Sequence, residues 1–252
     1  MTRKSHPASS SLGKSLSTII GLTLAGAAFA MPAQAATITF EGGAGAAYID
    51  GDTYSESGYT FQFLSPFADG AGSLVGANID GSDPSWCQSM ACPTGTSGAY
   101  YGALNDSLIS ILSDSGNPFR LQGFDASFIG HTNELGGYMS TVGLIEVRGL
   151  TADGAVLSED FWLGGPGQNG FSFANFAATT MFDNAFTELL MIGYACTADG
   201  FCRAYQSNAA QFGIDNMVLV ADDASEVPEP ASGLLLGIGL MGLLARARRR
   251  TA

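Results

Sequence analysis

The chain has 252 residues and a formal net charge of −13, from 10 Lys and Arg against 23 Asp and Glu. Seven of the ten basic residues lie in the first 14 or the last seven positions, so residues 36–227 hold three arginines, no lysine and 22 acids. This interior charge of about −19 excludes a nucleic-acid partner, because phosphate binding needs clustered cations.

The first 35 residues have the three parts of a secretory signal peptide. A basic start is followed by an apolar stretch over residues 16–30 and by a small-x-small cleavage motif. The residues that mark the expected cleavage site are Ala33, Ala35 and Ala36. A mitochondrial presequence, the alternative, would carry more arginine along one face. We therefore expect an N-terminal signal helix, export through the secretion translocon, and removal of residues 1–35 by signal peptidase.

Residues 36–223 have the pattern of one all-β ectodomain. Glycine is abundant, with 34 in the whole chain, and short runs of aromatic and β-branched residues alternate with polar ones. Eight strands are predicted, over residues 37–41, 59–64, 108–112, 120–129, 142–150, 155–162, 188–194 and 211–220. Strands of this length between Gly, Asp, Asn and Pro turns predict an antiparallel β-sandwich that is jelly-roll-like. Residues 171–186 fit either a short helix or a loop that fills the core.

Two local patterns sharpen this prediction. Tyr59, Phe61 and Phe63 alternate with polar residues and should share one buried face of a strand. The Asp153-Gly154 pair between two predicted strands is typical of a β-hairpin turn.

The four cysteines form two close pairs, Cys87 with Cys92 and Cys196 with Cys202. An oxidising compartment after export favours disulfides, and four cysteines allow three connectivities. We expect the two local pairs, because turn residues flank each of them. A zinc site, the alternative, lacks CxxC spacing and a nearby histidine.

The C-terminal end has a different composition. A polar linker over residues 224–227 precedes a tail over residues 228–252, in which an apolar stretch at 231–245 predicts a single transmembrane helix. That stretch is shorter than the usual ~20 residues, and snorkelling arginines could make up the difference. A buried core helix explains neither the prolines before the stretch nor the arginines after it. Arginines on the cytoplasmic side would place the domain outside.

The tail resembles the PEP-CTERM sorting signal of Gram-negative bacteria. The resemblance rests on a proline-glutamate-proline element, a glycine-rich hydrophobic span and a terminal arginine cluster, in that order. The residues that carry it are Pro228, Glu229, Pro230, Arg246, Arg248, Arg249 and Arg250. It implies a transient anchor in the inner membrane, cleavage by an exosortase, and transfer to the cell surface or extracellular matrix. Such proteins are commonly encoded beside exopolysaccharide genes, so exopolysaccharide is a candidate partner.

The interior resembles the β-sandwich ectodomains that often precede this tail, most tellingly in the strand that begins Gln211-Phe212 and reaches Asp215. Many carbohydrate-binding jelly rolls hold a structural Ca²⁺ with one acid near the end of the first strand and one in the last. Glu41 and Asp215 stand at the matching places, and carboxylates suit Ca²⁺. Strand alternation requires Asp215 to face solvent or to be turned inward by a bulge.

Aromatic side chains are the candidates for sugar contact. Trp86, in a loop beside Cys87, is the best surface candidate, and Trp162 is expected in the core. Tyr100 and Tyr101 are two further candidates.

No catalytic set is evident, so we expect that the protein is not an enzyme. His131 is the one histidine after residue 35, and no GxSxG elbow occurs. Asp50 with Asp52 and Glu159 with Asp160 could serve a glycosidase, but such pairs arise by chance among 22 acids. The sequence therefore predicts an exported structural protein of the cell surface or matrix. A glycan-binding module is the alternative, and a secreted hydrolase the third possibility.

Overall fold

The computed structural model describes residues 35–67, 72–96, 98–205 and 208–222. The predicted signal helix, the linker and the sorting tail, including the expected transmembrane helix, lie outside these residues. Within the described residues, no helix is long and apolar enough to cross a membrane.

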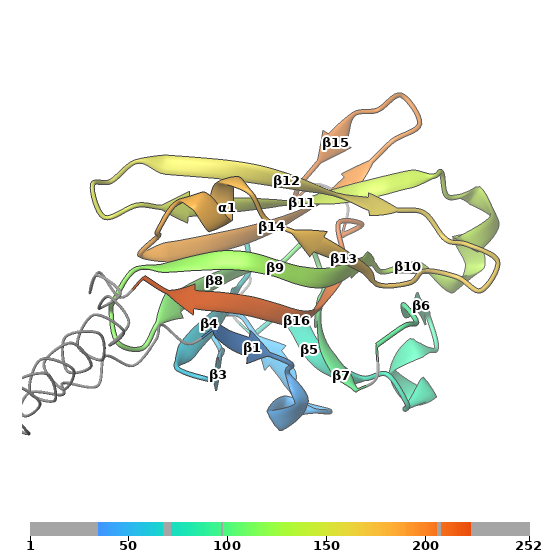
Figure 1. Cartoon of the computed structure of the whole chain (residues 1–252). Coiled ribbons are helices and arrows are strands. Elements are labelled where there is room, and N and C mark those ends of the chain that lie inside the picture. The colour runs from blue at the N-terminus through green and yellow to red at the C-terminus, as the bar shows by residue number, and fades with distance from the viewer. Residues whose placement is uncertain (1–34, 68–71, 97, 206–207, 223–252) are drawn as a thin grey trace, which may run out of the picture. The chain divides into compact units, whose positions relative to one another are not determined.

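The domain is a sandwich of two antiparallel sheets of seven strands each (Figure 1). Sheet A has the order β13-β9-β16-β7-β5-β2, and β1 also pairs with β16. Its strands are β1 (Ala35–Ile38), β2 (Ala47–Ile49), β5 (Leu74–Asp80), β7 (Ala99–Ala103), β9 (Phe119–Phe128), β13 (Ala174–Ala177) and β16 (Phe212–Ala221).

Sheet B has the order β12-β11-β14-β8-β4-β3, and β15 pairs with β14. Its strands are β3 (Thr53–Glu56), β4 (Tyr59–Leu64), β8 (Leu108–Ser113), β11 (Thr141–Leu150), β12 (Val156–Gly164), β14 (Glu188–Cys196) and β15 (Cys202–Arg203). Two short strands outside the sheets, β6 (Met90–Ala91) and β10 (Gly130–His131), pair with each other. The predicted β-sandwich is thus present.

All eight predicted strands occur, but the first one is displaced. β1 ends at Ile38, and Glu41 begins a short 3-10 turn, η1 (Glu41–Gly43), instead of lying in the strand. Two central strands were not predicted. β5 and β7 are rich in Ala and Gly and are buried on both faces, so they lack the alternation that marks a half-exposed strand.

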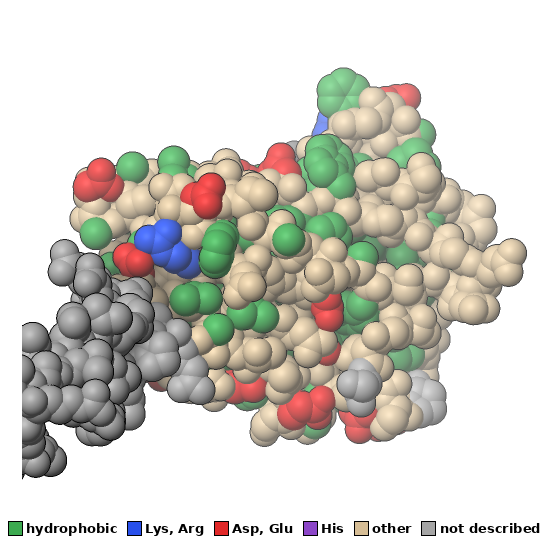
Figure 2. Space-filling model, in the orientation of Figure 1, with side chains coloured by type: hydrophobic (Ala, Val, Ile, Leu, Met, Phe, Trp, Pro, Cys, Tyr) green, Lys and Arg blue, Asp and Glu red, His purple; other side chains and the backbone are tan. Residues whose placement is uncertain are grey.

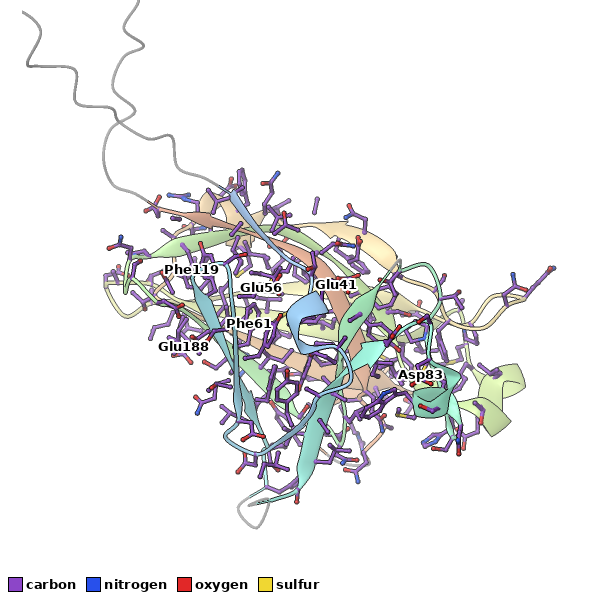
Figure 3. The ribbon with its side chains drawn as sticks, turned by 90° about the horizontal axis from the view of Figure 1, so that it is seen from below. Glu41, Glu56, Phe61, Asp83, Phe119 and Glu188 are labelled. Carbon is purple, nitrogen blue, oxygen red and sulfur yellow. A yellow bond between two sulfur atoms is a disulfide. The ribbon has the colours of Figure 1, made fainter. Side chains whose placement is uncertain are left out.

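Aromatic rings from both sheets fill the space between them. The rings of Phe63 in β4 and Tyr101 in β7 stack with their centroids 4.1 Å apart, and Phe61 meets Phe40 edge to face at 5.4 Å. Phe61 lies inside the sandwich, as Figure 3 shows. Tyr59, Phe61 and Phe63 are all buried, as the alternation predicted.

Both predicted disulfides are present, Cys87–Cys92 and Cys196–Cys202. The first lies in the loop that covers the outer face of sheet A. Trp86 and Cys92 in this loop pack against a small second core that includes Ile79 and Tyr100. The loop also contains the 3-10 turn η2 (Pro84–Cys87), in which the Asp83 carboxylate accepts a hydrogen bond from the N–H of Ser85.

The ambiguous stretch 171–186 contains both a strand and a helix. β13 adds to the edge of sheet A, and the one-turn helix α1 (Thr180–Asp183) follows it. Glu159 in β12 accepts hydrogen bonds from the N–H groups of Thr179 and Met181, which satisfies donors at the start of α1. The Asp153-Gly154 hairpin joins β11 to β12 as predicted, with Gly154 at φ 85°.

The second core generates a stability prediction. The Tyr100 hydroxyl is buried and has no hydrogen-bond partner among the described residues. Tyr100→Phe should therefore leave the free energy of unfolding unchanged or raise it by about 1 kcal/mol, because an unsatisfied buried polar group is removed. Urea unfolding of the purified mature protein measures the change.

Tyr101→Phe is the matched control, since the Tyr101 hydroxyl donates to the carbonyl of Val75 at 3.4 Å. That variant should lose stability, by about 0.5–1 kcal/mol. A larger loss for Tyr100→Phe than for Tyr101→Phe would contradict the prediction.

Candidate functional site

The outer face of sheet B carries an exposed tryptophan. Phe161 and Leu163 in β12 point into the core, so Trp162 between them points outward, and its exposed fraction is 54%. This contradicts the expectation that Trp162 belongs to the core. β12 is the edge strand of sheet B, and a strand with only one neighbour leaves such a ring uncovered. Sequence alternation alone does not show which face of an edge strand is covered.

Strand register extends this face from Trp162 across three strands. Trp162 lies opposite Leu144 in β11, which in turn lies opposite Tyr194 in β14. Two residues further along β11 and β12, and so on the same face, Asp160 lies opposite Glu146. We call Trp162, Asp160, Glu146, Arg148 and Tyr194 the outer face of sheet B.

An ion pair holds the polar side chains of this face in place. Arg148 donates to both carboxylate oxygens of Glu146, from Nε at 2.8 Å and from Nη2 at 2.7 Å. The Tyr194 hydroxyl donates to the same carboxylate at 2.6 Å. Hydrogen bonding from Arg148 lowers the pKa of Glu146, while burial and the bond to Glu146 raise the pKa of Tyr194 to about 12. The three side chains therefore keep fixed charges and a fixed geometry at neutral pH.

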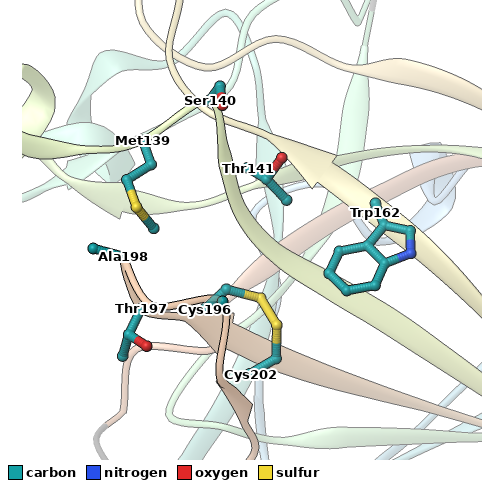
Figure 4. A pocket seen from close by; sticks show the side chains of 9 residues that line it. Met139, Ser140, Thr141, Trp162, Cys196, Thr197, Ala198 and Cys202 are labelled. Atoms are coloured by element: carbon teal, nitrogen blue, oxygen red, sulfur yellow. A yellow bond between two sulfur atoms is a disulfide. The ribbon is translucent and has the colours of Figure 1, made fainter.

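A cavity of about 400 Å³ lies beside Trp162 (Figure 4). It is lined by Trp162, by the Cys196–Cys202 disulfide and by short polar or apolar side chains, namely Met139, Ser140, Thr141, Thr197 and Ala198. We call it the Trp162 cavity. Its lining joins one aromatic face to three hydroxyl groups, which is the combination that small-molecule sites use. The disulfide connects β14 to β15 at its wall.

A second cavity of about 420 Å³ lies next to the first, and the two share Cys196 and Thr197. Its lining includes the buried apolar residues Phe128, Ile129 and Val142. Besides Thr197, its polar lining residues are His131, Glu134, Tyr138, Arg203 and Gln211. We call it the Arg203 cavity. Neither cavity could be predicted from the sequence, because the lining residues of each come from distant parts of the chain.

The other candidate aromatics lie in packed surroundings. Trp86 is half-buried against the second core, and the side chains of Tyr100 and Tyr101 are fully buried. Of the four aromatic candidates, Trp162 is thus the one with an open face.

Glu41 and Asp215 come together, although they lie 174 positions apart in the chain. β1 runs antiparallel to β16 with Ile38 opposite Met217, which brings the turn after β1 toward Asp215. Asp215 is buried, and a register shift follows it, with Asn216 at φ 48°. Neither of the two expected possibilities holds, because Asp215 alternates with the core residue Ile214 and lies on the outer face of sheet A, where it is buried and bonded by Thr96 instead of facing solvent.

Neighbouring protein groups bond both carboxylates. The Thr96 hydroxyl donates to Asp215 at 2.6 Å, and the Ala99 N–H donates to Glu41 at 3.0 Å. Gly98 lets Glu41 approach, since a Cβ there would lie 1.6 Å from Glu41 Oε1. Burial raises the pKa of Asp215, and the charges of Asp125 and Glu41 add to this effect.

The donor set suits a calcium ion only in part. Two carboxylates provide a fraction of the six to eight oxygens that Ca²⁺ takes. No group of three or more His, Cys, Asp or Glu side chains that could hold a metal occurs within the described residues. Backbone carbonyls or water would have to complete the shell, so calcium stays a prediction.

Three of the four carboxylates considered for hydrolysis have structural partners. Asp50 accepts from the N–H of Ser65, Asp52 accepts from the N–H of Ile49, and Glu159 accepts from α1. His131 is exposed in β10, where its N–H donates to the Tyr138 hydroxyl.

Residues 226–250 match the PEP-CTERM protein-sorting motif. The chain therefore ends in a PEP-CTERM sorting signal, which implies export, sorting to the surface and exosortase processing. The sorting residues named above fall in this segment, outside the described residues. No curated protein matches the sequence.

Three solved structures are similar to this chain. They are TmCBM61 in complex with β-1,4-galactotriose, the enzymatically active domain of tailspike protein 4 from bacteriophage CBA120, and the CBM22-1–CBM22-2 tandem domain of Xyn10C from Paenibacillus barcinonensis. The first has 11% identity and a TM-score of 0.31, and the match covers 73% of this chain and 94% of that one. The second has 15% identity and a TM-score of 0.29 over 65% and 19%. The third has 9% identity and a TM-score of 0.27 over 78% and 48%. At these scores they carry no information about a ligand of this chain.

The buried carboxylate generates a prediction about calcium and pH. Because the pKa of Asp215 is raised, the folded state binds its proton more tightly than the unfolded state does. Stability is therefore lost as pH rises from the ordinary pKa of Asp through the raised one. In EGTA at pH 7, Asp215→Asn should raise the melting temperature by about 2–4 °C, which corresponds to about 1 kcal/mol in a domain of this size.

If the two carboxylates bind Ca²⁺, millimolar Ca²⁺ should make the wild type melt at a higher temperature than Asp215→Asn. The melting temperature of the wild type should then rise above its value in EGTA, while that of Asp215→Asn should not change. Mg²⁺ is the control for screening by divalent charge. Equal wild-type melting curves in Ca²⁺ and in EGTA would rule the calcium site out.

Proposed function

We propose that this exported PEP-CTERM protein binds glycans, with the Trp162 ring as the stacking surface on the outer face of sheet B. Trp162 carries the proposal, because it is an exposed indole at the wall of a cavity that also presents hydroxyl groups. An exposed indole gives a flat apolar surface on which a sugar ring can stack, with a polar N–H at its edge.

The chemistry of the site suits a sugar. The apolar face of a pyranose ring packs on an indole, which leaves the sugar hydroxyls at the edge to exchange hydrogen bonds. Ser140, Thr141 and Thr197 each offer one donor and two acceptor lone pairs. The Glu146–Arg148–Tyr194 network lies on the same face and is held by bonds of 2.6–2.8 Å. Such preorganised groups lose little freedom when a ligand binds.

The site lies at the end of the sandwich opposite to Ala221, the last residue of β16. β16 ends at Ala221, which lies opposite Phe119 at the start of β9. At the other end of the paired strands β16 and β9, Phe212 lies opposite Phe128. Phe128 lines the Arg203 cavity, which is next to the Trp162 cavity. Both cavities therefore lie far along the sandwich from the end of its last strand.

The proposed role is non-catalytic retention of exopolysaccharide at the cell surface or in the matrix. Three of the four carboxylates considered for a glycosidase, Asp50, Asp52 and Glu159, accept hydrogen bonds from backbone N–H groups, which supports a non-catalytic role. Asp and Glu side chains are scattered over the face shown in Figure 2, and the net negative charge of the domain favours solubility outside the cell. The same protein can be a structural component of the matrix by holding glycan chains together.

Glycan binding should depend on Trp162. Trp162→Ala should weaken binding on a glycan array by at least tenfold, which corresponds to a loss of about 1.4 kcal/mol of stacking. Trp86→Ala is the matched control, because Trp86 packs against the second core on the other sheet. It should keep the affinity, although its melting temperature should fall. Undiminished binding by Trp162→Ala would refute the proposed site.

Exosortase should remove the sorting tail. Mass spectrometry of the mature surface protein should detect no peptides from residues 233–245 in cells that contain an exosortase. Replacing Pro228, Glu229 and Pro230 with alanine should retain these peptides and leave the protein in the inner membrane. Retention of the peptides on most wild-type molecules would show that the tail is a permanent anchor.

A further inference from the structure

The lining of the Trp162 cavity is uncharged. Among the described residues that line it, none is Asp, Glu, Lys, Arg or His, and its polar side chains carry hydroxyl groups. Charged or ionisable side chains, namely His131, Glu134 and Arg203, line the neighbouring Arg203 cavity instead. An ionised sugar group that entered the Trp162 cavity would lose water without gaining a charged partner from the lining, which is costly. The lining therefore favours an uncharged ligand.

A carboxylate lies beside Trp162 on the outer face of sheet B. Asp160 and Trp162 are two residues apart in the edge strand β12, so their side chains point to the same side and their Cα atoms are about 7 Å apart. Both side chains are exposed. Within the described part of the chain, Asp160 takes part in neither a hydrogen bond nor an ion pair. In this it differs from the three other carboxylates considered for hydrolysis.

The other charges of this face are already paired. Glu146, opposite Asp160 in β11, accepts hydrogen bonds from Arg148 and from the Tyr194 hydroxyl. Arg148 in turn directs its Nε and Nη2 groups to the Glu146 carboxylate. The outer face of sheet B thus keeps one net negative charge, and Asp160 carries it.

We propose that Asp160 is a specificity-determining residue of the glycan site and that the glycan held by Trp162 is neutral. The inference rests on the proposed glycan binding and names the class of glycan. A sugar ring stacked on Trp162 directs two adjacent hydroxyl groups toward the Asp160 carboxylate, which accepts a hydrogen bond from each. Hydrogen bonds from hydroxyl groups to an ionised carboxylate are shorter and stronger than bonds between neutral groups.

Electrostatics opposes a uronic acid at this position. The carboxylate of a uronic acid stacked on Trp162 would lie within the Debye length of about 8 Å from Asp160, so salt would screen the repulsion only in part. The rest of the domain acts in the same direction, because residues 36–227 carry a charge of about −19. An acidic sugar would also offer one hydroxyl group fewer to the acceptor. The site therefore selects against acidic glycans.

The experiment first identifies the oligosaccharides that the purified mature protein binds. The array holds neutral oligomers of glucose, galactose, mannose and xylose, with oligogalacturonate and oligomannuronate as acidic oligomers. We expect neutral oligomers to be retained. Calorimetry then compares the retained hexose oligomer with the same molecule after oxidation of its hydroxymethyl groups to carboxylates. The oxidised form should bind at least fivefold more weakly.

Substitutions at Asp160 should change this preference in a graded way. Asp160→Asn should weaken binding of the neutral form by about fivefold, because hydrogen bonds to a charged acceptor become bonds to a neutral one. It should not weaken binding of the oxidised form, since the repulsion is removed. Asp160→Lys should reverse the preference. Because the Asp160 side chain is exposed and unbonded, both variants should melt at the temperature of the wild type.

Asp114→Asn is the matched control, since it makes the same change of net charge away from the site. Asp114 follows β8, which two strands separate from β12, and it accepts a hydrogen bond from Thr60 that an asparagine oxygen can also accept. This variant should keep both the affinity and the preference. Loss of the preference in the control as well, or its survival in Asp160→Asn, would overturn the inference.

The failure of this inference is distinguishable from that of the proposed function. Tightest binding of an acidic oligomer, lost in Trp162→Ala, would refute the neutral-glycan inference and leave glycan binding intact. Tighter binding of a chitosan oligomer than of the matching chitin oligomer, dependent on Asp160, would do the same, because the ligand would then be an amino sugar. Binding of no oligosaccharide by the wild type would refute both.

Discussion

The pairing of the last strand, β16, is the constraint on which sheet A depends. One edge of β16 pairs with β9 from Phe212 to Ala221. The other edge pairs first with β7 and then with β1, so two short strands share it. The bulge at Asp215 and Asn216 lies where this neighbour changes. Sheet A therefore cannot close until the last strand of the domain has been exported, which is a folding order dominated by long-range contacts.

Acidic side chains stabilise many of the segments between the strands by accepting hydrogen bonds from backbone N–H groups. Glu56 in sheet B accepts from the N–H groups of Thr39 and Phe40 where the chain leaves β1, and so links the two sheets (Figure 3). Asp106 accepts from the N–H groups of Asn208 and Ala210 in the segment that leads to β16. A carboxylate is a strong acceptor for N–H groups that lack a strand partner. Much of the negative charge of the domain thus has a structural use, which explains why acidic pairs in the sequence were poor guides to a reaction site.

The sequence was informative where a residue pattern has one local cause. Alternation in Tyr59–Leu64 marks a strand buried on one face, and the spacing of Cys87 and Cys92 permits a local disulfide. The features that the sequence did not predict depend on which strands pair and which faces are covered in the folded domain. β5 and β7 lack alternation because they are covered on both faces, and Trp162 is exposed because β12 has a neighbour on one side only. Met139, Trp162 and Cys196 all line the candidate site, and their spacing in the sequence does not predict that they lie close together.

The Cys196–Cys202 disulfide connects the candidate site to the compartment in which the protein works. β15 has two residues, too few to keep the hairpin in place by strand pairing alone. The disulfide closes a short loop, so its contribution to stability falls below the ~3 kcal/mol expected for a 15-residue loop, and its main effect is to fix the shape of the hairpin. Both cavities include Cys196 in their walls, and Arg203 follows Cys202 directly. Disulfides form after export, in an oxidising compartment. The site would therefore take its final shape only outside the cytoplasm, on the side of the membrane where surface glycans are present.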